Sequence, residues 1–334
     1  MSRTIEIHVR NKRTAVMNNI FDPNEFGVRI AVQGNNKIDK SFIRGVIQGI
    51  KEARFGEQVI QAMGKKGTYK FIKHYEKSGN QHLIFRLYAD NKVNYHDYEL
   101  VKSGDKVKAA DIFIYLTGEN LSETLARALV KMDEMGNKLS RDEDFKADDL
   151  KKIKKLMNEK KFEEAKAYFD KMPSGIKKEK LFLFINMQIC AQLNDSLYLE
   201  SMENYSKLYP QEPNTFLLMI DYYALKDDYR NVLEYINRLD SLIDKDPFLD
   251  YYRAIAHKQI GEKEKAAECL ERLYREMPDF SEGVIELIAC YFDADKEKEA
   301  IGLAKAYKSS KSFDEDHMNS LLLLYPKLSK ALEN

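Results

Sequence analysis

The residues best suited to acid–base chemistry form the run Tyr95-His96-Asp97-Tyr98. A histidine beside a carboxylate can exchange protons near neutral pH, and Arg86 is expected to lie across a strand hairpin from this run. Neighbouring side chains of a strand point to opposite faces, so His96 and Asp97 cannot cooperate directly. We therefore do not expect an enzyme, and we keep Arg86, Tyr95, His96 and Asp97 as a candidate pocket.

Other chemical motifs are incomplete. The segment from Gly64 to Thr68 contains two lysines, but it lacks the earlier glycine of a phosphate-binding loop. It also lacks the following helix of a nucleic-acid-clamping loop, because residues 68–75 alternate as a strand does. No two histidines stand four residues apart, and the acidic runs 142–144 and 314–316 lack the glycine of a calcium loop. We expect no metal and no cofactor.

Three scattered cysteines, Cys190, Cys269 and Cys290, fall in amphipathic stretches. Their spacing supports neither a disulfide framework nor a zinc site, and we expect them to pack as small apolar side chains.

Composition narrows the function further. The chain has 334 residues, enough for two domains, and its 54 basic side chains balance 54 acidic ones. This balance argues against a dedicated nucleic-acid binder. The N-terminal residues carry charges throughout, and no apolar run is long enough to span a membrane. We expect a cytoplasmic protein, or a periplasmic one if an upstream signal segment has been removed.

A 34-residue period organises the second half of the chain. The unit that starts at Pro247 is the clearest. Its characteristic residues are Ala254, Gly261, Ala266, Leu270 and Pro278. Small residues let two helices approach closely, Gly261 can end the first helix in a left-handed conformation, and Pro278 stops the second helix. Steps of 34 place Asp227 and Asp295 where Gly261 stands. Residues 315–332 are expected to form a capping helix.

This segment resembles the tetratricopeptide repeat family, most closely at Tyr252-Arg253-Ala254 with Gly261, Ala266 and Pro278. The resemblance implies a polypeptide partner in a groove lined by the first helix of each hairpin. The family's groove positions fall on Leu217, Asp221, Tyr251, Lys258, Gln259, Glu282, Ile285, Phe292 and Asp293. We expect a peptide or helix held by Tyr251 and Phe292, with Lys258 fixing its register. Alternatively, the chain's own N-terminal domain or capping helix fills this groove.

The first half has an α+β pattern. Residues 4–9 alternate as a short strand, and residues 39–63 show helical spacing. Four strands are expected at about 69–76, 82–89, 93–102 and 107–117, followed by a helix from about Ser122 to Met132 with Ser122 as its N-cap. In the middle hairpin we pair Arg86 with Asp97, Phe85 with Tyr98, and Leu83 with Leu100. This register separates an exposed charged face of the sheet from an apolar face.

The run from Asn94 to Leu100, followed by the one from Lys106 to Ile114, resembles the last strands of nuclear-transport-factor-like, or ketosteroid-isomerase-like, cone domains. That resemblance implies a cone with room for a small apolar ligand. We expect a cone-like α+β domain at residues 1–138 and an all-α repeat domain at 146–334. The expected function is a non-catalytic adaptor that binds another polypeptide. The alternative is a small-molecule or lipid carrier whose repeats mediate assembly.

Overall fold

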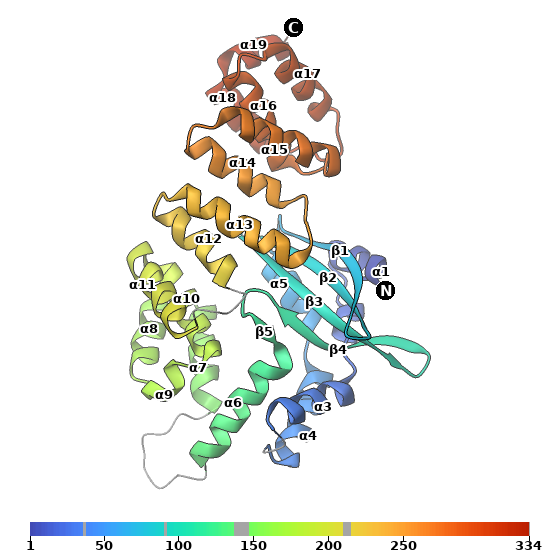
Figure 1. Ribbon diagram of the computed structural model, residues 1–334, viewed down its shortest axis with the longest axis vertical. Helices are drawn as coiled ribbons and strands as arrows, with labels where there is room; N and C mark the ends of the chain where they lie inside the picture. The colour runs from blue at the N-terminus through green and yellow to red at the C-terminus, as the bar shows by residue number, and fades with distance from the viewer. Residues whose placement is uncertain (36–37, 90–91, 137–146, 210–214, 334) are drawn as a thin grey trace. The chain divides into compact units, whose positions relative to one another are not determined.

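The computed structural model describes residues 1–35, 38–89, 92–136, 147–209 and 215–333 (Figure 1). They belong to two units, Met1–Leu218 and Met219–Asn334. The first unit holds an α+β domain and the first helical hairpins, and the second holds further hairpins. The expected domain boundary, between residues 138 and 146, lies outside the described residues.

Five helices precede the sheet: α1 Ser2–Arg10, α2 Ala15–Asn18, α3 Pro23–Gln33, α4 Lys40–Glu52 and α5 Phe55–Met63. The expected strand at residues 4–9 is wrong, because these residues belong to α1. Ile5 and Val9 are buried one helical turn apart, whereas Ile7 is exposed. Alternating apolar residues over only six positions are compatible with the period of a strand and with that of a helix. Packing of Ile5 and Val9 against the sheet favours the helix.

The helical stretch at 39–63 is divided into α4 and α5 at Ala53 and Arg54. Helix α3 lies against α4, and Gly27 permits this approach. A Cβ atom on Gly27 would come within 2.7 Å of the Ile47 side chain.

An antiparallel sheet with strand order β1-β2-β3-β4-β5 follows the helices. Its strands are β1 Thr68–Lys77, β2 Asn80–Ala89, β3 Lys92–Ser103, β4 Lys106–Ile114 and the short β5 Glu119–Asn120. The four long strands lie where the sequence predicts them, except that the fourth ends at Ile114 instead of residue 117. Ser78, Gly79 and Gly104 have positive φ in two of the tight turns, as their turn composition indicates.

The register of the β2–β3 hairpin differs from the prediction by two residues. Arg86 faces Tyr95, and Asp97 faces Ile84. A shift of two preserves the faces, so Arg86 and Asp97 still share one face as diagonal neighbours. They are, however, 2% and 6% exposed, and the expectation of an exposed charged face is wrong.

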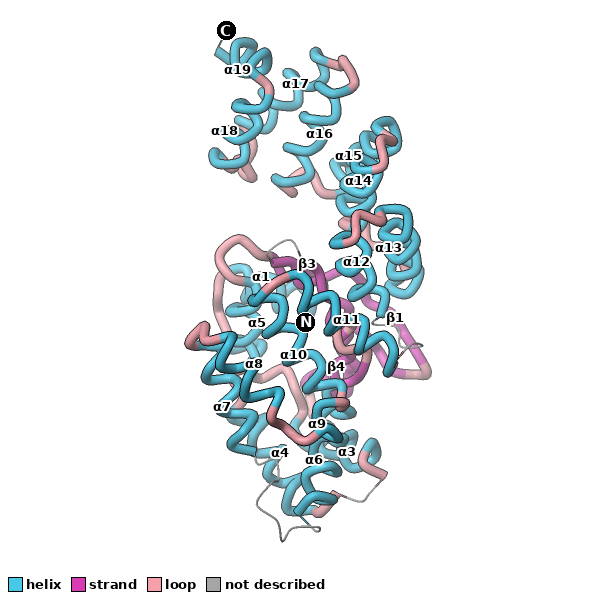
Figure 2. The backbone as a smooth tube through the Cα atoms, turned by 90° about the vertical axis from the view of Figure 1, so that its left-hand side faces the viewer, coloured by secondary structure: helices cyan, strands magenta, loops and turns pink. Residues whose placement is uncertain are grey.

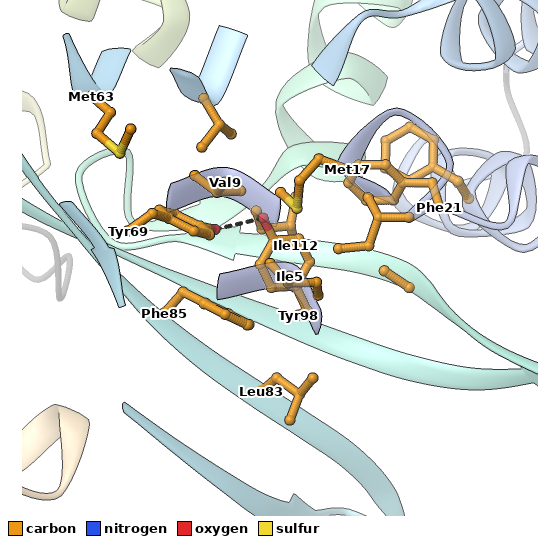
Figure 3. Close-up of a cluster of buried hydrophobic side chains, with 14 of the residues drawn as sticks. Ile5, Val9, Met17, Phe21, Met63, Tyr69, Leu83, Phe85, Tyr98 and Ile112 are labelled. Atoms are coloured by element: carbon orange, nitrogen blue, oxygen red, sulfur yellow. Dashed lines mark hydrogen bonds between the residues drawn. The ribbon is translucent and has the colours of Figure 1, made fainter. Parts of the chain in front are cut away.

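The opposite face of the sheet carries the main core of the α+β domain (Figure 3). Helices α1, α2, α3 and α5 contribute Ile5, Val9, Met17, Phe26 and Met63, among others, to it. Phe85 stacks on Tyr69 with ring centroids 5.1 Å apart, and the Tyr69 and Tyr98 hydroxyls are hydrogen-bonded at 2.7 Å. The space between sheet and helices is therefore occupied by side chains.

Helix α6, Leu121–Gly136, packs against α3 and β4. Ser122 lies inside the helix instead of at the expected N-cap. Its hydroxyl donates to the buried Asp111 carboxylate, which also accepts the Ser122 backbone N–H at 3.2 Å. Tertiary hydrogen bonding has replaced the predicted local cap.

The remaining chain forms helical hairpins. In the first unit these are α7 Ala147–Asn158 with α8 Phe162–Asp170, the short α9 Ser174–Lys177, and α10 Lys180–Leu193 with α11 Asp195–Leu208. Helix α12, Thr215–Leu225, precedes α13 Tyr229–Ile243. The second unit continues with α14 Leu249–Gln259, α15 Lys263–Glu276, α16 Ser281–Asp293 and α17 Glu297–Lys308, and ends in α18 Glu315–Leu324 and α19 Pro326–Glu333 (Figure 2).

The predicted 34-residue period is visible in the helix starts. The second helices α11, α13, α15 and α17 begin at Asp195, Tyr229, Lys263 and Glu297. Gly261, Asp227 and Asp295 all adopt positive φ, between 55° and 79°, at the turn of their hairpins. Aspartate tolerates this left-handed conformation better than most residues, so the repeat continues without glycine. The capping region is two helices rather than one, because Pro326 separates α18 from α19.

Candidate functional site

The candidate pocket of the sheet is divided between its two faces. Arg86, Tyr95 and Asp97 lie on the face opposite the main core, while His96 points into the core. The Tyr69 hydroxyl lies 3.0 Å from His96 Nδ1. Burial lowers the pKa of His96 to about 4, so the imidazole is neutral at physiological pH. His96 and Asp97 therefore do not form an acid–base pair.

Asp97 has other partners. His82 Nδ1 lies 3.1 Å from Asp97 Oδ1, and the Tyr75 hydroxyl donates to Asp97 Oδ2. The sequence did not single out His82 and Tyr75 as partners of Asp97. The shifted hairpin register places all three on one face, and no local motif reports this. A carboxylate held in this way orients the imidazole, but it does not by itself define a reaction.

The predicted groove begins on α12, which contains Leu217 and Asp221. Leu217, in the first unit, is buried among core side chains, and Asp221, in the second, is half-buried. In the second unit, Tyr223 of α12 stacks on Tyr235 of α13 with centroids 5.4 Å apart. Leu217 is therefore a buried residue of the first unit and does not present its side chain to a partner.

Tyr251 lies on α14, half-buried and within an aromatic group. Its ring lies 5.1 Å from the Phe280 ring, edge to face, and 6.1 Å from that of Phe248. Ala254, on the same helix, is buried in the cluster that joins α14, α15 and α16. Part of the Tyr251 ring thus packs against Phe280 and Phe248, and the rest of its surface is accessible to solvent.

Lys258 and Gln259 end the same helix. Lys258 Nζ forms an ion pair with Glu286 Oε2 of α16 at 2.5 Å, and both side chains are about one-third exposed. Gln259 is exposed, whereas Glu282 and Ile285 of α16 are half-buried. The first helices of two successive hairpins thus share a charged link at their accessible surface.

Phe292 and Asp293 end α16, and a residue of the cap contacts both. The Tyr325 ring lies 5.3 Å from the Phe292 ring, and the Tyr325 hydroxyl donates to Asp293 Oδ1 at 2.9 Å. Burial and the Asp293 carboxylate raise the pKa of Tyr325, so its hydroxyl keeps its proton. At this end, the chain's own capping segment contacts two of the predicted partner-binding residues.

A separate polar pocket of about 260 Å³ lies between α8, α10 and α11 in the first unit. Lys166, Asn186, Cys190 and Ser201 are among the residues that line it. The Cys190 thiol donates to Asn186 Oδ1 at 3.7 Å, and the Ser201 hydroxyl to the Tyr198 carbonyl at 2.6 Å. Both groups are satisfied within the protein. The repeat pattern did not predict this pocket, because its lining includes second helices.

No cofactor site emerges from the described part of the chain. Within it, no three histidine, cysteine or acidic side chains gather as metal ligands. All three cysteines are buried and free, and burial raises the pKa of the Cys290 thiol to about 11. No helix of the described residues is long and apolar enough to cross a bilayer.

The chain thus consists of an α+β domain followed by tetratricopeptide-type helical hairpins. No protein-family model matches the sequence, and no curated protein does. Among solved structures, residues 41-end of MamA from Desulfovibrio magneticus RS-1 match with a TM-score of 0.40 at 16% identity. The match covers 54% of this chain and 94% of that MamA segment. YrrB, described as a TPR protein with an unusual peptide-binding site, matches with a TM-score of 0.38 at 12% identity, over 54% of this chain and 87% of YrrB. At these values the repeat assignment rests on the helix spacing and burial of this chain.

Proposed function

We propose that this chain is a non-catalytic adaptor that holds another polypeptide on the first helices of its hairpins. The observation that supports this most is the accessible row on α14 and α16. It combines an aromatic side chain, Tyr251, with the Lys258–Glu286 ion pair and the exposed Gln259. Aromatic and paired charged groups of this kind fix an extended peptide or a helix in place.

Two further parts of the proposal come from the sequence. We place an α+β domain at 1–138 and a repeat domain at 146–334, and we propose neither a nucleic-acid partner nor a reaction. The filled core of the α+β domain leaves the lipid-carrier alternative without a supporting observation.

The test exchanges the members of one ion pair. Lys258→Glu combined with Glu286→Lys keeps an ion pair at the same place but reverses the direction of charge along the row. Exposed pairs of this kind contribute about 0–1 kcal/mol, so the free energy of unfolding should change by less than about 0.5 kcal/mol.

Affinity capture with the tagged full chain then compares the exchanged protein with the unchanged one. The matched control is Arg275→Glu, an exposed charge reversal on the second helix α15. We expect the captured polypeptides to fall at least tenfold with the exchanged pair and to remain with the control. Equal capture by all three proteins would contradict a site on α14 and α16.

A further inference from the structure

Tyr325 does not make the contact that the equivalent residue of the preceding repeat makes. Helix α18 begins at Glu315, 34 residues after the start of α16 at Ser281, so Tyr325 corresponds to Tyr291. The Tyr291 hydroxyl donates to Glu271 of the preceding second helix at 3.1 Å. Pro326 follows Tyr325 and ends α18 there, since a proline disfavours the helical conformation of the residue before it. The Tyr325 side chain lies instead on the end of α16.

The two residues that Tyr325 contacts are predicted partner-binding residues. Phe292 supplies an aromatic surface, and the exposed Asp293 supplies a carboxylate acceptor at its edge. Thirty-four residues earlier the same places carry Lys258 and Gln259, which are polar and accessible. The last groove position therefore suits an aromatic ring with a hydroxyl at its far end, whereas the equivalent position of the preceding hairpin suits a polar partner.

We propose that Phe292 and Asp293 form a tyrosine-binding subsite, and that Tyr325 is a built-in occupant which a tyrosine of the partner polypeptide displaces. This inference rests on the proposed function, because it names the side chain that the groove selects. The ring packs on Phe292, and the phenolic O–H donates to the Asp293 carboxylate.

The same geometry defines which side chains the subsite rejects. Phenylalanine would cover Phe292 but leave the Asp293 carboxylate without the phenolic donor, so it binds more weakly. Phosphotyrosine would bring its phosphate against the Asp293 carboxylate, and like charges repel. Phosphorylation of the partner's tyrosine would then release it.

Displacement of Tyr325 requires only a local rearrangement. Leu321 and Leu328, on either side of it, are buried in the cluster that joins α16, α17, α18 and α19. Between them, Leu323 and Leu324 are 83% and 76% exposed, whereas Leu322 and the displaced Tyr325 pack against this cluster. Displacement therefore gives up the contacts of the Tyr325 side chain, while Leu321 and Leu328 remain as buried anchors.

The test empties the subsite in the full chain with Tyr325→Ala and adds N-acetyl-L-tyrosinamide as the probe. Binding is followed by saturation-transfer NMR, and far-UV circular dichroism checks the fold. We expect the variant to bind the probe at least tenfold more tightly than the unchanged protein, in which Tyr325 competes. N-acetyl-L-phenylalaninamide should bind several-fold more weakly, and the phosphorylated tyrosine derivative should not bind.

A second variant covers the case in which Tyr325→Ala loses its fold. Tyr325→Phe keeps the ring but removes the hydrogen bond to Asp293, so the probe should compete better than in the unchanged protein. The inference is overturned if a folded Tyr325→Ala protein binds the probe no better than the unchanged chain, or prefers the phenylalanine derivative. If Tyr325→Ala does not fold, Tyr325→Phe decides, and an unchanged affinity overturns the inference.

The outcome is separable from that of the proposed function. Loss of capture with the Lys258–Glu286 exchange, together with no probe binding, would retain the adaptor and reject the tyrosine subsite. Probe binding with unaffected capture would retain the subsite at the end of α16 and reject the Lys258–Glu286 pair as part of the partner's surface.

Discussion

A buried ion pair gives the sharpest energetic prediction. Lys180, at the start of α10, and Glu119, in β5, are 3% and 2% exposed, and Lys180 Nζ lies 3.4 Å from Glu119 Oε2. Glu119 also pairs with Arg127 of α6 and accepts the Thr124 hydroxyl at 2.6 Å. The pair therefore attaches the second helical hairpin to the α+β domain within the first unit.

The two partners should respond unequally to removal. Lys180→Met leaves Glu119 with Arg127, so the cost should be about 1–3 kcal/mol, at or below the range for breaking a buried pair. Glu119→Gln removes the carboxylate charge from a buried site and leaves Lys180 Nζ its contact with the Tyr209 ring, 5.1 Å from the ring centroid, so the cost should be about 3–5 kcal/mol. Arg127 is over one-third exposed and can be hydrated instead. The double variant should cost less than the sum of the two single changes.

Urea unfolding followed by far-UV circular dichroism measures these differences. Lys155→Met is the matched control, because Lys155 pairs with Glu159 at 3.8 Å but is 76% exposed. It should shift the free energy of unfolding by less than about 0.5 kcal/mol. Equal small effects of Lys180→Met, Glu119→Gln and the control would refute a buried pair that attaches α10 to the sheet.

Other predictions address the repeats and the buried ionisable groups. Ala254→Leu should destabilise the hairpins by about 1–3 kcal/mol, because Ala254 is fully buried between helices, and the thermal midpoint will show it. Gly261→Ala should cost about 1 kcal/mol through its positive φ alone, since no atom lies within 4 Å of an added Cβ; an unchanged urea midpoint would contradict this. Burial raises the pKa of Asp111 to about 6, so the folded state binds its proton more tightly than the unfolded state. The free energy of unfolding should thus fall by about 2 kcal/mol as pH rises from about 4 to 6, and Asp111→Asn should remove that dependence. His96 has the opposite sign: its pKa of about 4 lies below the unfolded value, so stability should be lost as pH falls from about 6.5 to 4, and His96→Gln should abolish this loss in pH-dependent melting curves.

The repeats could be predicted from the sequence because each place in the period has a separate steric reason. Gly261 and its equivalents Asp227 and Asp295 fall at the same turn, and all three adopt the left-handed conformation. The strands were predictable for a similar reason, since turn residues bound each of them.

Tertiary packing decided the features that the sequence did not reveal. Residues 4–9 alternate in polarity, yet contacts of Ile5 and Val9 with the core make them helical. The β2–β3 register moved by two residues, a shift that leaves the polarity of both faces unchanged and that pattern alone cannot exclude. The partners His82 and Tyr75 of Asp97 depend on that register.

The sequence predicted the positions of the candidate groove and left open whether the chain's own cap fills it. The repeat places Phe292 and Asp293 on the first helix of a hairpin, whereas Tyr325 lies in the capping segment, where the period ends at Pro326. Tyr325 of the cap contacts Phe292 and Asp293, and the repeat pattern does not predict these contacts because its period ends at Pro326.

Site-specific photo-crosslinking tests the adaptor most directly. A photoreactive amino acid replaces the exposed Gln259 on α14 in one protein and the exposed Arg275 on α15 in another. We predict a crosslinked polypeptide from position 259, lost when excess unlabelled chain competes, and none from position 275. Crosslinking from position 275 without any from position 259 would contradict a partner held on the first helices of the hairpins.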